Sequence, residues 1–188
     1  LHAVADLLVE HLGQVRAAWT PGAENYRRGF VAGDGKDALR KLLAGMIVLS
    51  GFEMAGERLA VAYETKDQEQ EHSCFSDNTH RDFITNQRGI LDLYGGEGFG
   101  MRGVGVRDLA LKVAPELVDT LDRALADTEA AVQGLPTPFD QGILGADDTP
   151  GRRAVLRSIE CLEVQTEALA ALALACGYEI PVEPGAGR

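Results

Sequence analysis

Residues 37–66 read DALRKLLAGMIVLSGFEMAGERLAVAYETK, and this stretch decides the fold. It contains no proline, and its apolar side chains recur three or four residues apart, the spacing of one face of an α-helix. A helix of roughly 30 residues is about 45 Å long at 1.5 Å per residue. We therefore expect the longest helix of the chain here, with an apolar face formed by Leu39, Leu42, Leu43, Met46, Ile47 and Leu49.

Prolines and glycines mark where the other helices begin and end. No segment shows the sustained alternation of apolar and polar residues that a strand would need. The pattern predicts an all-α fold, an antiparallel helical bundle of four to five main helices, as a single domain over residues 1–180 with a loose tail at 181–188. The helices beside the longest one are expected at 4–19, from Ser76 or Asp77 to Gly95, at 106–113, from Pro115 to Gly134, and from Pro150 to Gly177.

Composition limits the class of protein. The chain has 188 residues, 45% of them hydrophobic, which is enough for one domain with a real core. Its net charge of −11 argues against a nucleic-acid partner or an anionic membrane surface. No apolar run approaches the roughly 20 residues of a membrane-spanning helix. The three cysteines form no C-x-x-C pair, so we expect neither a zinc knuckle nor a dense disulfide framework.

Polar residues occupy positions where the seam of a bundle should be apolar. Continuing the apolar stripe of residues 42–49 by further helical turns places Glu53 inward, with Glu57 and Arg58 beside it. A carboxylate buried there would need a partner. An exposed pair of Glu53 and Glu57, or a structural ion pair with Arg58 or Arg88, is the alternative, and the pattern leaves both open. On the next helix, the same reasoning places Asn86 inward.

Three glycines interrupt the longest helix. Gly45, Gly51 and Gly56 each cost about 1 kcal/mol relative to alanine inside a helix. Such a cost indicates a packing reason, and we expect a close approach of a neighbouring helix at these positions.

Metal-capable and hydrogen-bonding side chains are densest at residues 69–83, EQEHSCFSDNTHRDF. His72, Asp77, His80 and Asp82 have the chemistry of ligands for zinc, iron or manganese. Their spacing matches no metal motif, since His80 and Asp82 would point about 200° apart on a helix. The alternative is that Ser76, Asp77, Asn78 and Thr79 cap the start of a helix, with Asp82 in its first turn.

Several segments together resemble the imelysin family of iron-regulated, peptidase-like proteins. They are GFEMAGERL at 51–59, ETKDQEQEHSCFSDNTHRDFITNQRGILDLYGG at 64–96, TPGAENYRRGF at 20–30 and PTPFDQGI at 136–143. The resemblance implies an all-helical protein of the bacterial cell envelope, periplasmic or associated with the outer membrane. It also implies two related bundle domains with a site in the groove between them, and a role in iron acquisition. Proteins of this family were first described as proteases.

One family motif is missing. The signature GxHxxE does not occur, since His11 is followed by Leu12, Gly13 and Gln14. The chain therefore resembles the C-terminal half of such a protein, and the resemblance implies an N-terminal partner half that carries GxHxxE. The lack of an initiator methionine fits a processed chain, a clipped fragment or an excerpt of a longer protein.

The resemblance also implies which residues form the site. Glu71 matches a recurrent family position, and the ligand chemistry of His72 and His80 adds them to it as candidate ligands for iron or zinc. The ligand-binding or interdomain site would be formed by Glu53, Glu57, Arg58, Ser76, Asp77, Asn78, Thr79, Asp82 and Asn86.

Three functions follow from these expectations. The favoured one is a binding protein for a metal ion or small ligand. A metal-dependent peptidase is the alternative, in which a metal-bound water attacks a carbonyl with a glutamate as general base. The zinc-peptidase motif H-E-x-x-H is absent, and so is a Ser/His/Asp set in a recognisable order. The third possibility is that this half only supports its partner domain.

Overall fold

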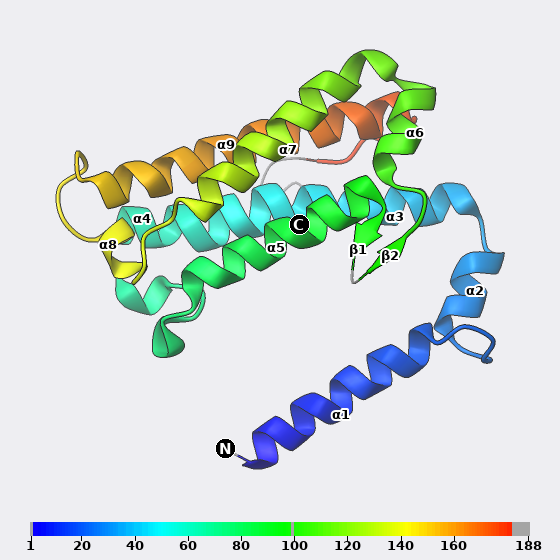
Figure 1. Ribbon diagram of the computed structural model, residues 1–188, viewed down its shortest axis with the longest axis horizontal. Coiled ribbons are helices and arrows are strands. Elements are labelled where there is room, and N and C mark those ends of the chain that lie inside the picture. The colour runs from blue at the N-terminus through cyan, green and yellow to red at the C-terminus, as the bar shows by residue number, and fades with distance from the viewer. Residues whose placement is uncertain (1, 99, 182–188) are drawn as a thin grey trace. The chain divides into compact units, whose positions relative to one another are not determined.

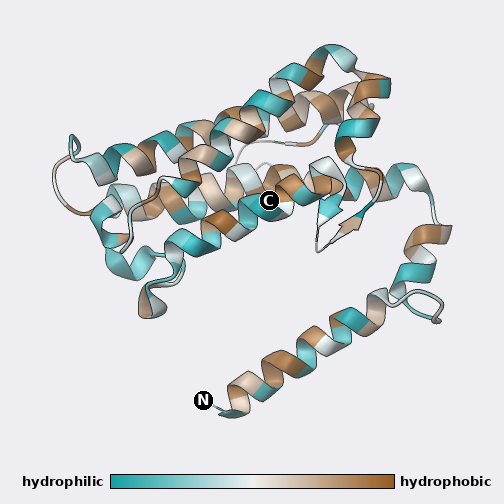
Figure 2. Cartoon of the chain, in the orientation of Figure 1, coloured by the Kyte–Doolittle hydropathy of each residue, from teal (hydrophilic) through white to brown (hydrophobic). Residues whose placement is uncertain are grey.

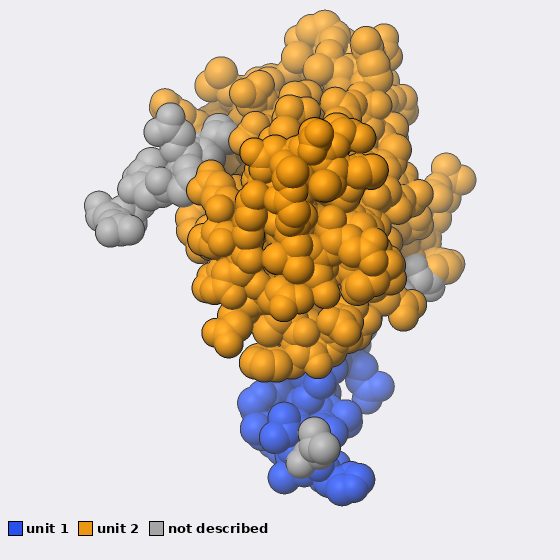
Figure 3. Space-filling model, turned by 90° about the vertical axis from the view of Figure 1, so that its left-hand side faces the viewer, with its two compact units in different colours: residues 1–42 blue, residues 43–188 orange. Residues whose placement is uncertain are grey.

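The computed structural model of the chain describes residues 2–98 and 100–181. It contains two compact units, residues 1–42 and residues 43–188, which Figure 3 shows in different colours. The predicted single domain over 1–180 remains a prediction. Of the predicted loose tail, residues 182–188 lie outside the described part of the chain.

The first unit contains α1 (His2–Trp19), α2 (Tyr26–Ala32) and the start of α3 (Gly35–Ile47). Asn25 fixes the turn between α1 and α2, because its side-chain amide donates 2.8 Å hydrogen bonds to the carbonyls of Ala17 and Thr20. Its side-chain oxygen also accepts from the backbone N–H of Arg28 and so caps α2. The rings of Trp19, Tyr26 and Phe30 pack together with centroids 5.3–6.1 Å apart.

The second unit is a bundle of four long helices. Its first helix joins the end of α3 to η1 (Val48–Ala60) and α4 (Val61–Thr65), and the others are α5 (Thr79–Gly95), α7 (Val118–Gln133) and α9 (Pro150–Ala175). Figure 1 shows that each of these long helices runs in the opposite direction to the long helix before it. α9 lies against η1 and α7, and α5 lies against α7. The predicted all-α antiparallel bundle is therefore confirmed.

The core of the bundle is apolar and close-packed. Each long helix alternates between hydrophobic and hydrophilic residues along its length (Figure 2). Phe83 of α5 stacks on Phe139 with ring centroids 6.1 Å apart, and both rings are fully buried. The other large buried side chains include Leu43, Met46, Ile47, Met54, Leu59, Ile90, Leu121, Leu125, Ile143 and Leu162.

The register within the longest helix differs from the prediction. η1 is a π-helix, whose hydrogen bonds join residue i to i+5 and not i+4. Burial therefore falls on Met54, Ala55 and Leu59. Of the two alternatives left open for Glu53, the inward one is wrong, because Glu53 is about 40% exposed and pairs with Arg58 of the same helix at 3.6 Å. This is the structural ion pair that the sequence had left open. Glu57, expected beside it, is exposed.

A hydrogen-bonded group of amides and a hydroxyl crosses the core in place of those carboxylates. Gln87 of α5 and Gln165 of α9 bond to each other, and Gln165 Nε2 donates to Ser50 Oγ of η1 at 2.9 Å. All three side chains are buried. Asn86, predicted to face inward, is only half-buried, because the inward position belongs to its neighbour Gln87.

Short elements connect the long helices. They are η2 (Gln68–Gln70), η3 (Cys74–Ser76), β1 (Glu97–Gly98), β2 (Met101–Arg102), α6 (Val106–Val113), η4 (Pro115–Leu117) and α8 (Asp140–Ile143). β1 and β2, with two residues each, pair in an antiparallel hairpin that the sequence did not predict.

One buried arginine holds α8 in place. Arg152 of α9 donates to the carbonyls of Tyr63 and Ile143 at 3.0 and 2.6 Å and to Asp147 at 2.9 Å. Its guanidinium also lies 3.7 Å from the centre of the Tyr63 ring. These contacts fix α8, and with it Asp140, beside the loop that precedes α5.

Candidate functional site

The loop that joins α4 to α5, residues 66–78, carries five of the twelve predicted site residues, and α5 carries another four. Figure 1 shows this loop and α8 at the same end of the bundle. Lys66 and Asp77 have φ of 55° and 52°, in the left-handed region, which reverses the chain at both ends of the loop. The loop therefore folds back towards the start of α5.

Thr79 is the centre of this arrangement. It is fully buried, its hydroxyl accepts from the backbone N–H of Ser73 at 3.1 Å, and the same hydroxyl donates to Glu71 Oε2 at 3.3 Å. A single threonine at the first turn of α5 thus fixes both the backbone of the loop and one oxygen of Glu71. The helix begins at Thr79 with Asn78 before it, so the predicted start at Ser76 or Asp77 is wrong, because those residues form the end of η3 and the left-handed turn.

Asp82 lies one turn further along α5 and faces the same loop. Ser73 Oγ donates to Asp82 Oδ2. His72 Nδ1 lies 3.9 Å from the same carboxylate oxygen, and the His72 ring meets Phe83 edge-on at 6.1 Å. The imidazole and the carboxylate are each about 30% exposed, so both remain open to solvent.

The second oxygen of Glu71 has no partner among the described residues. The Glu71 side chain is only 6% exposed, and its buried Oε1 accepts no hydrogen bond from residues 2–98 or 100–181. Burial raises the pKa of Glu71, the nearby charges of Asp140 and Asp77 raise it further, and the bond from Thr79 lowers it.

Glu71 lines a cavity of about 190 Å³. We call this cavity the Glu71 pocket, and it is formed by Glu69, Glu71, Cys74, Phe75, Asp77 and Asp140, together with Gln68. Its charged lining side chains are all carboxylates. The Phe75 side chain is fully exposed.

The structure brings some predicted residues together and separates others. Glu71, His72, Thr79 and Asp82 meet at the loop, and Asp77 lines the Glu71 pocket. Ser76 and Asn78 are exposed beside them, and His80 is half-buried with an Nδ1 that has no hydrogen-bond partner in the described part of the chain. Within the described residues, no hydrogen bond or ion pair joins this group to Glu53, Glu57, Arg58 or Asn86.

Ser73 and Asp140 were missed by the sequence prediction. Both lie inside segments that carry the family resemblance, 64–96 and 136–143, and that is the signal that could have found them. Asp140 lies 69 positions from Glu71 in the chain, so only the fold shows that both line one cavity.

One further feature limits what this site can hold. Over residues 2–98 and 100–181, no three or more His, Cys, Asp or Glu side chains gather where they could hold a metal ion. His72 and Asp82 therefore form a pair of donors and not a complete coordination sphere.

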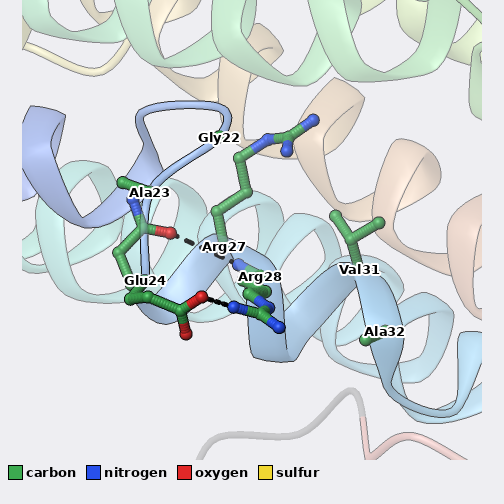
Figure 4. A pocket seen from close by; sticks show the side chains of 8 residues that line it. Gly22, Ala23, Glu24, Arg27, Arg28, Val31 and Ala32 are labelled. Carbon is green, nitrogen blue, oxygen red and sulfur yellow. Dashed lines mark hydrogen bonds and ion pairs between the residues drawn. The ribbon is translucent and has the colours of Figure 1, made fainter.

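The first unit contains another depression, of about 370 Å³, between the α1–α2 turn and α2 (Figure 4). Glu24 pairs with Arg28 at its edge, and the Arg27 side chain extends away from that pair. Most of its lining residues are exposed, so it lacks the buried polar groups of a formed site.

Comparison with known proteins gives one positive result. The model of the imelysin family, a peptidase family, matches residues 1–169. No curated protein matches the chain. Among the described residues, no helix has the length and apolar character needed to cross a membrane. Since the family match covers most of the sequence, and the all-helical fold agrees with it, the chain belongs to the imelysin family.

Proposed function

We propose that this chain is one half of a ligand-binding protein of the bacterial cell envelope that serves iron acquisition. The ligand is a metal ion or small molecule, held in a groove that the chain shares with an N-terminal half carrying GxHxxE. The proposed location is the periplasm or the outer membrane. The family membership supports the class of protein. The groove, the partner half and the location rest on the resemblance of the sequence.

The observation that carries the binding role is the pair formed by His72 and Asp82. Their facing atoms are 3.9 Å apart, less than the sum of two metal bonds of about 2.0–2.2 Å to imidazole nitrogen and carboxylate oxygen. One iron or zinc ion could therefore contact both, and a neutral imidazole with a carboxylate suits either metal. The pair supplies two ligands, and we propose that the His and Glu of the partner half supply others.

The surroundings of the pair support this role. Metal-bound carboxylates and imidazoles in proteins are oriented by hydrogen bonds from a second layer of groups. Ser73 donates to Asp82, and Thr79 holds the backbone of Ser73, so the carboxylate is fixed before any ligand arrives. Both donors keep part of their surface exposed on the same end of the bundle.

Metal titration tests the proposal. Calorimetry with Zn²⁺, and with Fe²⁺ under anaerobic conditions, should show binding that His72→Gln and Asp82→Asn each weaken by about tenfold or more. Glu64→Gln is the matched control, because Glu64 is an exposed carboxylate of α4 outside this group. Equal affinity in all four proteins would remove His72 and Asp82 from a metal site.

The second candidate function is a metal-dependent peptidase, which the description of the family as a peptidase family favours. It predicts that the purified protein cleaves a denatured protein substrate only when metal is present, and that the His72 and Asp82 variants lose this cleavage. Metal binding without any cleavage supports the binding role over the peptidase. An intact mass of the native polypeptide near twice that of this chain would support the partner half.

A further inference from the structure

The His72–Asp82 pair does not explain why the Glu71 pocket contains a buried carboxylate with an oxygen that is unpartnered among the described residues. Glu71 is buried, and Thr79 satisfies only one of its two oxygens. A buried acceptor left without a partner costs free energy unless a ligand or solvent donates to it. No donor among the described residues reaches Glu71 Oε1, and a donor group bound in the adjoining cavity would satisfy it.

The charge around this oxygen has one sign. Asp77 and Asp140 face the cavity with Glu71, and Glu69 also lines it. Both aspartates act on Glu71 by like-charge repulsion, and within the described residues no lysine or arginine lines the cavity to offset them. A positive group in the cavity would turn this repulsion into attraction towards several carboxylates at once.

The size and walls of the cavity favour an organic cation over a bare metal ion. A volume of about 190 Å³ holds several non-hydrogen atoms, and no described set of three donors converges closely enough to coordinate a metal. An ammonium group carries three N–H donors and can satisfy separate carboxylates at about 2.7–2.9 Å. The exposed ring of Phe75 and the Cys74 side chain offer an apolar and aromatic wall for the methylene stem of such a group.

We propose that the Glu71 pocket binds the ammonium group of an alkylamine, with Glu71, Asp77 and Asp140 as its acceptors and Phe75 against its carbon chain. The amine is either a free small molecule or a lysine side chain of a polypeptide, since both present the same group. This inference concerns a cavity next to the His72–Asp82 pair and does not depend on a metal being bound there.

Two matched probe pairs test the inference in buffer that contains a chelator. The first is n-butylamine against n-butanol, and the second is a short peptide with one lysine against the same peptide with that lysine acetylated. Amide chemical shifts of ¹⁵N-labelled protein, recorded at neutral pH, should move in residues 68–77 with both charged probes and with neither neutral one. Butylamine and peptide binding equally would identify the free amine as sufficient, whereas much tighter peptide binding would identify a polypeptide lysine as the ligand.

Variants locate the site. Glu71→Gln and Asp140→Asn should each weaken amine binding by about tenfold, which is the effect of losing one charge-assisted hydrogen bond, while Glu64→Gln should leave it unchanged. Asp77→Asn, at an exposed position, gives the same test if a buried substitution prevents folding, which circular dichroism would detect. Shift changes that are equal for charged and neutral probes, or no binding of either amine, would overturn the inference. The amine titrations contain a chelator, so failure of the proposed metal site leaves their outcome unchanged and the two failures are distinguishable.

Discussion

Gln87 and Gln165 exchange two hydrogen bonds across the core of the bundle, one of 2.7 Å and one of 3.1 Å. Gln87 also donates to the carbonyl of Leu125 at 3.4 Å, and Gln165 donates to Ser50. The pair thus links α5, α7, α9 and η1 at one level. Because both amides are buried and each satisfies the other, the arrangement fixes the mutual register of the helices.

Breaking this pair on one side should be costly. Gln165→Leu leaves the Gln87 amide buried with fewer partners, and we expect a loss of about 1–3 kcal/mol in the free energy of unfolding. The double variant Gln87→Leu, Gln165→Leu should lose less than the sum of the two single losses, because no orphaned amide remains. Urea denaturation of the four proteins measures this, and additive losses would contradict a direct coupling between the two amides.

Gly51 should resist substitution. A methyl group there would lie 2.8 Å from Thr166 Cγ2, and Thr166 is buried with its hydroxyl bonded to Leu162, so it cannot move away cheaply. We expect Gly51→Ala to lower the free energy of unfolding by about 1–3 kcal/mol. Gly45→Ala is the matched control, because no described atom beyond its own helix backbone lies within 4 Å of the added carbon, and it should raise stability by up to about 1 kcal/mol. Equal effects of the two substitutions would show that η1 and α9 are not in tight contact.

The sequence predicted where the helices begin and end better than which of their residues face the core. Proline and glycine positions placed most helix ends within a few residues, since these residues act locally. The buried positions of the longest helix were predicted with the 3.6-residue repeat of an α-helix. The π-helix has a different repeat, and Met54 is buried in place of Glu53. Of the three glycines, Gly51 alone meets a neighbouring helix, because Gly45 faces open space and Gly56 faces the backbone of its own helix.

The part of the candidate site that depends on local sequence was predictable, and the part that depends on contacts between distant residues was not. Residues 69–83 were singled out because their residue types and their resemblance are local properties of the sequence. The internal bonds of the loop at 66–78 depend on two left-handed residues, Lys66 and Asp77, which are not glycines and so give no sequence signal. The contribution of Asp140 depends on how α8 is held by Arg152, a relationship between distant parts of the chain.

Glu71 should make the stability of the fold depend on pH. Its pKa is raised chiefly by burial, then by Asp140, so the folded protein keeps this proton to a higher pH than the unfolded chain does. Between the unfolded and the folded pKa the native state binds more protons, and the free energy of unfolding therefore falls as pH rises through that window. This contribution is fully present below the unfolded pKa of Glu71.

Glu71→Gln should remove this dependence, since the amide oxygen still accepts from Thr79 and carries no charge. Urea denaturation at several values from about pH 4 to about pH 8 should show a smaller decline for the variant than for the unmodified protein. Glu64→Gln serves as the exposed control and should follow the unmodified protein. An identical decline in Glu71→Gln would mean that Glu71 is not the group responsible.

His72 of the loop and Asp82 of α5 form the proposed metal-binding pair, and diffraction from crystals grown with zinc tests this pair most directly. An anomalous difference map recorded at the zinc absorption edge should show a peak within bonding distance of both His72 Nδ1 and Asp82 Oδ2. Peaks at other positions only, with none between these two atoms, would contradict the account.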